Sequence, residues 1–170
     1  RIAPSPTGNL HIGTTRTALF NYLFAKQNGG TFVIRIEDTD KERSKPEFEQ
    51  DIFAGLTHLG LIDEDTEIAQ KQSERTEIYK KYLQKLIDDG FAYESKEEVK
   101  EEGQRASVIR FKNPNKKVTF TDMIRGEITF DTTDLGDFVL AKSIEEPLFH
   151  LAVVVDDYEM KISHVIRGED

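Results

Sequence analysis

Apolar and polar positions in the first third of the chain predict a strand, a helix and a second strand. Ile2-Ala3 has the character of the end of a strand. Apolar residues at helical spacing run from Leu19 to Phe24 and stop at Gly29-Gly30, which predicts a helix that ends there. The β-branched run 31–36 follows the two glycines and predicts a buried parallel strand.

Two further helices are predicted before residue 90. Ser44 and Glu47 form a capping-box pattern ahead of an apolar helical face that ends at Gly60. Ser73 is predicted to open the next helix, which ends at Gly90. The order strand, helix, strand, helix predicts an α/β fold with a doubly wound parallel sheet.

The pattern changes after residue 90, where short alternating segments predict hairpin-like strands. They are Val108–Phe111, Val118–Thr121, Glu127–Phe130 and Phe138–Lys142. This change predicts an α+β insertion between two halves of the α/β core. Residues 148–155 fit a buried strand or a helix equally well, and residues 162–166 predict a strand that returns to the core.

The segment from Ala3 to Thr14 combines two prolines and two glycines with polar side chains, just before the first predicted helix. A turn that feeds a helix start presents free N–H groups and the positive end of a helix dipole, which suits a phosphate. Thr7 and His11 add side-chain donors. A purely structural loop would explain the glycines and prolines but not these polar side chains.

Composition narrows the classes of function. The chain has 170 residues and no cysteine, which excludes disulfides, thiolate metal sites and a catalytic thiol. It shows no apolar stretch of bilayer length and no signal peptide, so we expect a cytoplasmic protein with no membrane partner. It begins with Arg1 and ends at Asp170 directly after an apolar run, so we expect both ends to be cut.

The net charge of −9 has the wrong sign for a protein that coats nucleic acid nonspecifically. An acidic chain is still able to bind one folded RNA through a local basic face. Such binding by this chain alone is expected to be weak and strongly salt-dependent.

The segment His-Ile-Gly-Thr at residues 11–14 resembles the "HIGH" motif of class I aminoacyl-tRNA synthetases, and residues 1–8 narrow the resemblance to glutamyl-tRNA synthetases. Further segments match landmarks of that family in order: Arg16–Asn21, Arg35–Asp40, Gln72–Arg75, Val108–Phe111, Val154–Asp157 and His164–Asp170. The resemblance therefore covers essentially the whole chain.

This resemblance implies a Rossmann-type catalytic domain whose first half is residues 1–90. It further implies an inserted domain at 91–147 that contacts the tRNA acceptor end, and the truncated start of the second half at 148–170. The implied reaction uses ATP to adenylate L-glutamate and then transfers glutamate to the 3′ end of tRNA(Glu). We expect a monomer whose partners are tRNA(Glu), L-glutamate and ATP.

Glutamate carries two carboxylates and one ammonium group, so a selective pocket needs fixed cations and one anion. Arg1 and Arg167 lie at predicted strand ends and would bind the carboxylates through guanidinium forks; which arginine takes which carboxylate stays open. Glu37 would bind the ammonium group, although surface ion pairing is the alternative for all three. The resemblance adds contacts from Ser5, Phe149 and Val153.

For ATP, the resemblance implies that His11 and Thr7 contact the phosphates and that Gly13 lets the backbone approach closely. Glu169 and Asp170 lie where the family contacts ribose and adenine. These donors and Mg²⁺ would stabilise charge on the α-phosphate during in-line attack by a glutamate oxygen. No zinc is expected.

The chain departs from the family in several places. Phe149 stands where the family often has Tyr, and Val153 stands where some members carry a polar residue. Segment 93–107 is shorter than usual. The Lys-Met-Ser-Lys type loop and the anticodon-binding domain are absent, so this chain alone is expected to be inactive. Asp156, Asp157 and His164 are expected to orient the core.

Two rival functions remain. One is the glutamyl-queuosine tRNA(Asp) synthetase-like paralogue, which usually has cysteine zinc ligands and a residue other than Thr39 in the Glu-Asp-x-Asp motif. The other is a non-catalytic, synthetase-like RNA-binding module, which would not need to keep Arg1, His11, Glu37 and Arg167. The sequence leaves open whether a glutamine tRNA is also charged.

Overall fold

The computed structural model describes residues 1–97 and 106–168. The chain forms two compact units, one made of Arg1–Arg75 with Asp156–Asp170 and the other of Thr76–Val155. None of the helices in the described residues is both long and apolar enough to cross a bilayer.

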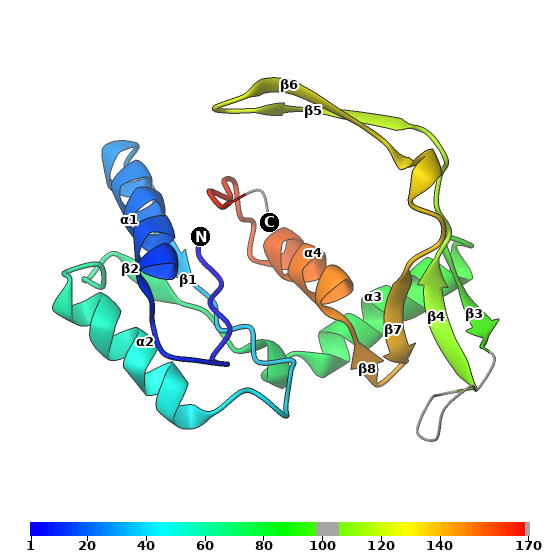
Figure 1. The fold of residues 1–170 in the computed structure, drawn as a ribbon, viewed down its shortest axis with the longest axis horizontal. Coiled ribbons are helices and arrows are strands. Elements are labelled where there is room, and N and C mark those ends of the chain that lie inside the picture. Colours follow the sequence, from blue (N-terminus) through cyan, green and yellow to red (C-terminus); the bar gives the residue numbers. More distant parts are fainter. Residues whose placement is uncertain (98–105, 169–170) are drawn as a thin grey trace. The chain divides into compact units, whose positions relative to one another are not determined.

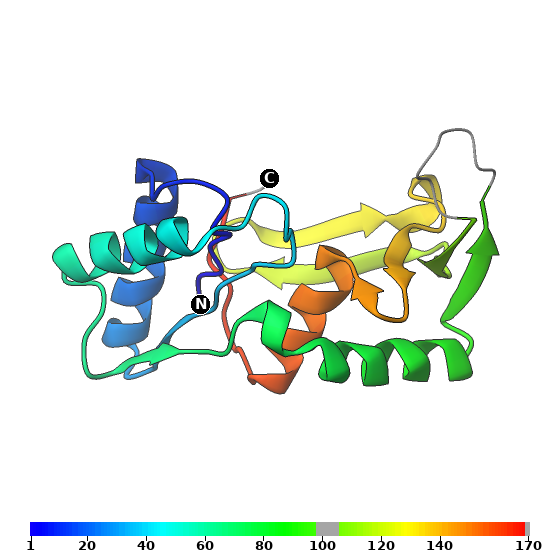
Figure 2. The ribbon, with the colours of Figure 1, turned by 90° about the horizontal axis from the view of Figure 1, so that it is seen from below.

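The first unit contains the parallel part of the structure (Figure 1). Its elements are α1 (Ile12–Gln27), β1 (Phe32–Ile34), α2 (Pro46–His58), β2 (Thr66–Ile68) and the 3₁₀ turn η1 (Gln72–Glu74). Strand β1 pairs in parallel with β2, in the register Phe32 to Thr66. Figure 2 shows α1 and α2 running in different directions.

The first residues of the chain run beside β1 on the side away from β2. Ile2 forms a parallel bridge with Ile34, and its main-chain N–H donates to Val33 O over 3.0 Å. Every residue of β1 is buried, as the apolar run predicts. The apolar core of this unit is Ile2, Ala18, Phe32, Ile34, Ile36, Ile52, Leu56 and Leu61.

The capping box predicted at Ser44 and Glu47 is wrong. Helix α2 begins at Pro46, its N-cap is Lys45, and no side chain caps it. Proline suits the first turn because it lacks the N–H group that would otherwise need a partner and its φ is preset for a helix. The predicted end is confirmed, because Gly60 follows the helix with φ +68°.

The second unit packs two helices on an antiparallel sheet. Its elements are α3 (Thr76–Asp88), β3 (Ala92–Lys96), β4 (Ser107–Phe111), β5 (Lys117–Asp122), β6 (Gly126–Asp131), the 3₁₀ turn η2 (Thr132–Asp134), β7 (Val139–Ser143) and β8 (Glu146–Pro147). Helix α4 (Phe149–Glu159) begins in this unit and ends in the other. The sheet order is β3-β4-β7-β8, and all three pairings are antiparallel.

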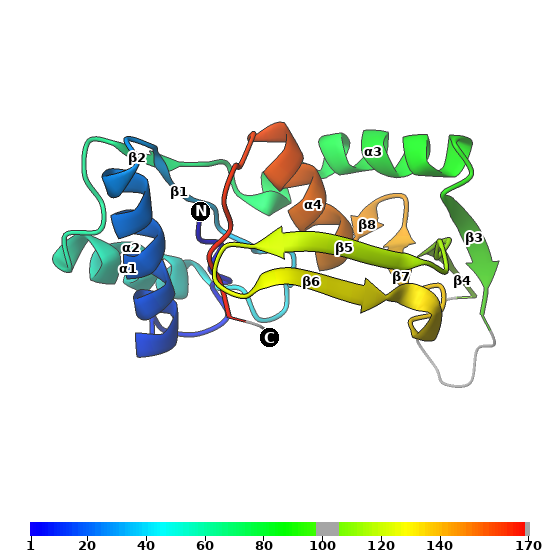
Figure 3. The same cartoon turned by 90° about the horizontal axis from the view of Figure 1, so that it is seen from above.

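The core of the second unit is apolar, with buried residues from α3, α4 and the sheet: Tyr79, Leu83, Ala92, Ile109, Leu140, Ala141, Leu151, Ala152 and Val155. Strands β5 and β6 form a separate hairpin that extends away from the four-stranded sheet of the same unit (Figure 3). One face of this hairpin carries Val118, Phe120, Ile128 and Phe130, because their partners in the ladder are Val118 with Phe130 and Phe120 with Ile128.

The structure decides the remaining predictions of secondary structure. The four strands predicted after residue 90 are confirmed as β4, β5, β6 and β7. All of the ambiguous segment 148–155 except its first residue belongs to helix α4, and the helix predicted from Ser73 starts instead at Thr76, after η1. The strand predicted at 162–166 is wrong, since no strand is assigned there.

Segment 162–166 is held by the Asn21 side chain and by the main-chain nitrogen of Arg1, and not by a ladder. Asn21 donates from Nδ2 to Ile166 O over 2.7 Å and accepts from Ile166 N–H over 3.4 Å. Parallel pairing in the described residues is confined to β1 with β2 and the bridge at Ile2. The structure therefore shows a small parallel α/β unit, and the larger doubly wound sheet remains a prediction.

Candidate active site

His11 caps the helix that follows the predicted phosphate turn. Its Nδ1 accepts a hydrogen bond from Gly13 N–H over 3.2 Å, and its Nε2 lies 3.2 Å from Thr14 Oγ1. A neutral imidazole that accepts at Nδ1 carries its proton on Nε2. This N–H faces the Thr14 hydroxyl, so a phosphate at this helix start would have to share or replace that contact to accept from His11.

Gly13 leaves space for the His11 ring in the position that it occupies. A Cβ atom at residue 13 would lie 2.9 Å from Cε1 of His11, a distance that real side chains essentially never show. The glycine thus makes room for the imidazole over the first turn of α1.

The turn also closes a small cavity of about 140 Å³, which brings together three of the predicted site residues, Ser5, Thr7 and His11. The turn is anchored to α2, since Leu10 N–H donates to Asp51 Oδ2 over 2.7 Å. The cavity is lined by Pro4, Ser5, Thr7, Gly8, Asn9, Leu10, His11, Thr14 and Ile52.

Arg1 and Glu37, predicted to bind opposite charges of glutamate, belong to one chain of ion pairs. Arg1 donates from Nε and Nη2 to the two carboxylate oxygens of Asp157, over 2.8 and 2.7 Å. Arg35, which is fully buried, donates from Nη1 to Asp157 Oδ1 over 2.8 Å and from Nη2 to Glu37 Oε1 over 3.2 Å. The charges alternate along the series Arg1, Asp157, Arg35, Glu37.

The ionisation of the two carboxylates differs because their surroundings differ. Burial raises the pKa of Glu37, and the charge of Arg35 offsets this only in part. Burial also opposes ionisation of Asp157, but the hydrogen bonds from Arg1 and Arg35 outweigh it and hold its pKa below the ordinary 3.8.

A second group of buried polar side chains surrounds Asp156, which has no exposed surface. Asp156 accepts from Arg75 Nε over 2.7 Å and from Gln72 Nε2 over 3.0 Å, and Arg35 Nε lies 3.5 Å from its Oδ2. Within residues 1–97 and 106–168, no group of three His, Cys, Asp or Glu side chains is placed to hold a metal ion.

The remaining predicted residues lie elsewhere. Arg167 is exposed, and its Nε donates to Gly168 O over 3.1 Å. Phe149 and Val153 lie on α4 within the second unit, where the Phe149 ring meets His150 edge to face. Glu169 and Asp170 lie outside the described residues.

Sequence reasoning missed Arg35 and the role of Asp157 as its partner. One signal was available, because Arg35 is a charged residue in an otherwise apolar predicted strand. A charge in a buried strand needs a counter-ion. Its partner is 122 positions away along the chain, so no local pattern identifies it.

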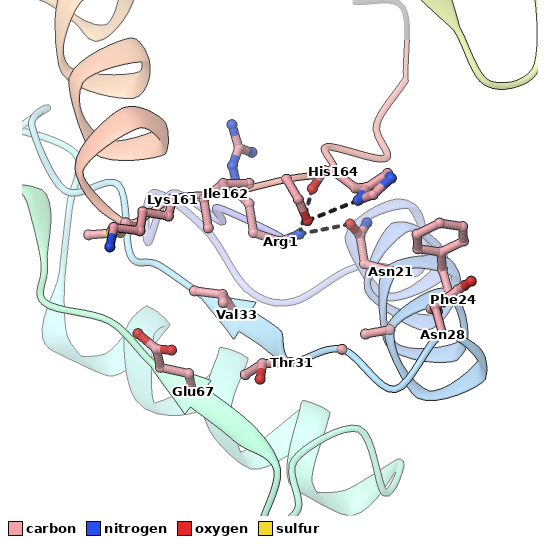
Figure 4. Close-up of a pocket in the computed structure, with 14 residues that line it drawn as sticks. Arg1, Asn21, Phe24, Asn28, Thr31, Val33, Glu67, Lys161, Ile162 and His164 are labelled. Atoms are coloured by element: carbon pink, nitrogen blue, oxygen red, sulfur yellow. Dashed lines mark hydrogen bonds between the residues drawn. The ribbon is translucent and has the colours of Figure 1, made fainter.

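A larger cavity of about 390 Å³ lies in the first unit, between the C-terminal half of α1, the start of β1 and segment 160–164 (Figure 4). At its wall the main-chain nitrogen of Arg1 donates to Asn21 Oδ1 over 3.1 Å and to His164 O over 3.2 Å. The His164 ring packs on Phe24, with ring centroids 5.0 Å apart. Thr7, His11 and Gly13, the residues predicted for ATP that lie in the described part of the chain, do not line this cavity.

Comparison with known proteins bears on this site. The family model described as "tRNA synthetases class I (E and Q), catalytic domain" matches residues 1–106 and 94–170. The chain is 46% identical to glutamate–tRNA ligase 1 of Petrotoga mobilis and 43% identical to the glutamate–tRNA ligase of Aquifex aeolicus. These alignments cover all of this chain but 41% and 42% of the relatives, so the chain spans less than half of their length.

The fold agrees with the sequence. The crystal structure of a glutamate tRNA ligase from Elizabethkingia meningosepticum, in complex with its amino acid, matches with a TM-score of 0.87 and 36% identity. The match covers 98% of this chain and 43% of that chain, and it indicates a Rossmann-like α/β core. The resemblance inferred from the motifs is confirmed, and the chain belongs to the catalytic-domain family of the class I tRNA synthetases (E and Q).

Proposed function

We propose that this chain provides the glutamate-activating part of a glutamate–tRNA ligase. ATP adenylates L-glutamate, and glutamate then passes to the 3′ end of tRNA(Glu). The observation that carries the proposal is the match over the whole chain to proteins named glutamate–tRNA ligase, at 46% and 43% identity. The intact series from Arg1 to Glu37 supports it, because it offers a cation and an anion for one amino acid.

The phosphate turn supports the ATP half of the reaction. Thr7 and His11 line one cavity at the N-terminus of α1, where an anion is favoured by the helix dipole. Donors fixed before the reaction stabilise charge that develops on the α-phosphate. Mg²⁺ bound with ATP supplies further charge neutralisation. No protein nucleophile is required, because a glutamate oxygen attacks the phosphate directly.

Recognition of glutamate, the other half of the reaction, would use charged side chains. Arg1 would hold one carboxylate and Arg167 the other, while Glu37 accepts from the ammonium group. Ser5, Phe149 and Val153 would complete the pocket, and Glu169 with Asp170 would contact the nucleoside of ATP. Glutamine lacks the second negative charge. Its binding would leave a desolvated guanidinium without a counter-ion, so the pocket would reject it.

The proposed domain boundaries assign residues 1–90 to the first half of a doubly wound catalytic domain. Residues 91–147 form the inserted domain that contacts the acceptor end of tRNA, and 148–170 begin the second half. The change from parallel pairing at β1 to antiparallel pairing from β3 onward supports an insertion. The exposed tip of the β5–β6 hairpin, at Met123 and Ile124, is a candidate contact surface for tRNA.

The test is pyrophosphate exchange into ATP by the full-length protein with glutamate and tRNA(Glu). We expect exchange with glutamate, and only when the cognate tRNA is present. Exchange with another amino acid and not with glutamate would contradict the proposal. Charging of tRNA(Asp) in place of tRNA(Glu) would favour the queuosine paralogue, and no exchange with any amino acid would favour a binding module.

A further inference from the structure

Arg1 is held in place before any ligand arrives. The two bonds from its Nε and Nη2 to Asp157 form a fork, which fixes both the position and the plane of the guanidinium. The Arg1 side chain is only 9% exposed. Among residues 1–97 and 106–168, Nη1 of Arg1 has no hydrogen-bonding partner, so its two N–H groups remain for a ligand.

Asp157 is itself fixed from the other side. Its Oδ1 accepts from Arg35 Nη1 over 2.8 Å in addition to Arg1 Nε. Arg35 is fully buried, and its Nη2 reaches Glu37. Asp157 therefore connects the proposed carboxylate ligand Arg1 to the residue that holds the proposed ammonium ligand Glu37.

Holding Arg1 in this way has an energetic consequence. A free arginine side chain carries considerable rotamer entropy, because it has several rotatable bonds. If that freedom is removed during folding, it is not lost again when glutamate binds, and affinity rises. A loosely held arginine would also distinguish a carboxylate from an uncharged amide less well, because this selectivity depends on the fork geometry.

The neighbouring aspartate has a different position. Asp156 is fully buried and binds Gln72 and Arg75, whereas the Asp157 side chain is 23% exposed and binds Arg1. A residue that only stabilised the core would be expected to be fully buried, as Asp156 is, and not partly exposed beside Arg1, as Asp157 is.

We propose that Asp157 is a positioning residue for amino-acid recognition: together with Arg35 it holds the guanidinium of Arg1 in the orientation that receives a carboxylate of glutamate. The proposal rests on the proposed function, since it takes Arg1 as a glutamate ligand. Asp157 itself does not touch the substrate.

The test replaces Asp157→Asn in the full-length protein, a change that keeps the shape and removes the charge. Pyrophosphate exchange is measured with tRNA(Glu) present while glutamate and ATP are varied separately. We expect the KM for glutamate to rise about tenfold, the scale of a charged hydrogen bond. We expect kcat and the KM for ATP to change less than about twofold. The reason is that the change weakens binding of the amino acid equally in the ground state and in the transition state.

A double-mutant cycle with Arg1→Ala shows whether Asp157 acts through Arg1. If it does, the variant with both changes binds glutamate no worse than Arg1→Ala alone. Asp157→Glu keeps the charge and is expected to restore part of the affinity. Asp63→Asn is the matched control, because Asp63 is 29% exposed and pairs with Lys26, away from Arg1.

The outcomes separate this proposal from the proposed function. A wild-type protein that shows no exchange with glutamate overturns the proposed function itself. If the wild type exchanges and Arg1→Ala raises the KM for glutamate while Asp157→Asn does not, the positioning role alone is overturned. A fall in melting temperature with an unchanged KM, or fully additive effects in the cycle, also overturns it.

Discussion

The two units of this chain bury different kinds of side chain. Six of the seven buried polar or charged residues in the described part of the chain lie in the first unit, and they include Arg35 and Asp156. The second unit has one, Asn113, beside an apolar core. Buried ion pairs seldom stabilise a protein more than apolar residues of the same volume. This difference fits the proposal that charges of the first unit orient ligands, whereas the core of the second unit is apolar packing.

The largest expected effect comes from breaking the buried charges. Replacing Asp156→Ala leaves Arg35 and Arg75 without a shared counter-ion and should lower the free energy of unfolding by about 3–5 kcal/mol. Urea denaturation measures it. The control in the other unit is Leu140→Ala, whose cost of about 2–5 kcal/mol arises from a cavity. A loss below about 1 kcal/mol for Asp156→Ala would show that the two cores do not differ in this way.

Replacing His11→Ala should separate catalysis from stability. The exposed imidazole is proposed to donate to a phosphate, so its loss should lower the adenylation rate by about 10²–10³-fold, the scale of one preorganised donor. Single-turnover kinetics measure the rate per folded molecule. The cap bond to Gly13 adds a stability cost of about 0.5–2 kcal/mol. A large fall in stability with an unchanged rate would make His11 a structural cap only.

Arg167→Lys tests amino-acid selection with a smaller change. The charge remains but the fork is lost, so glutamate use should fall by about tenfold or more, the scale of a charged hydrogen bond. The ratio of kcat/KM for glutamate to that for glutamine should also narrow if Arg167 binds the side-chain carboxylate. Arg167→Ala should cost more. If neither variant alters glutamate use, Arg167 is a surface residue and the pocket lies elsewhere.

The smallest effects concern the dependence of stability on pH. The pKa values of the two carboxylates of the series, Asp157 and Glu37, shift in opposite directions, so their effects on stability have opposite signs. The lowered pKa of Asp157 means that the native state binds fewer protons, so its contribution is present above pH 3.8 and is lost as pH falls below it. The raised pKa of Glu37 means that stability falls as pH rises from 4.5 through the native pKa.

The measurement is the free energy of unfolding from pH 2.5 to 7 for wild type, Asp157→Asn and Glu37→Gln. Asp157→Asn should reduce the loss of stability on the acid side, to which other carboxylates with lowered pKa values also contribute, and Glu37→Gln should reduce the loss above pH 4.5. A reversed assignment would mean that burial dominates at Asp157 and ion pairing at Glu37.

Local patterns predicted most of the elements because hydrophobic periodicity acts over a few residues. The hairpin strands after residue 90 and the helix ended by Gly60 were predicted correctly for this reason. The start of α2 was not, because Pro46 outweighs the cap offered by Ser44. The missing strand at 162–166 has another cause, since Asn21 takes hydrogen bonds that a ladder would use.

The candidate site was predictable where its residues are close in sequence. Ser5, Thr7 and His11 lie on one turn, and the structure places them around one cavity. The contact between Arg1 and Asp157 spans 156 positions, so only the folded chain brings these side chains together. Sequence alone identifies the charged residues of such a series, but the order in which they pair is a tertiary property.

Gly13 and His11 form a coupled pair with a consequence for directed evolution of this turn. A side chain at position 13 collides with the imidazole in its present position, so a substitution at position 13 alone requires the His11 ring to move, whereas a substitution at position 11 alone meets no such collision. Varying positions 11 and 13 together would admit combinations in which a smaller residue 11 accepts a larger residue 13. Related sequences that lack the histidine are therefore the ones in which we expect this glycine to be free to change.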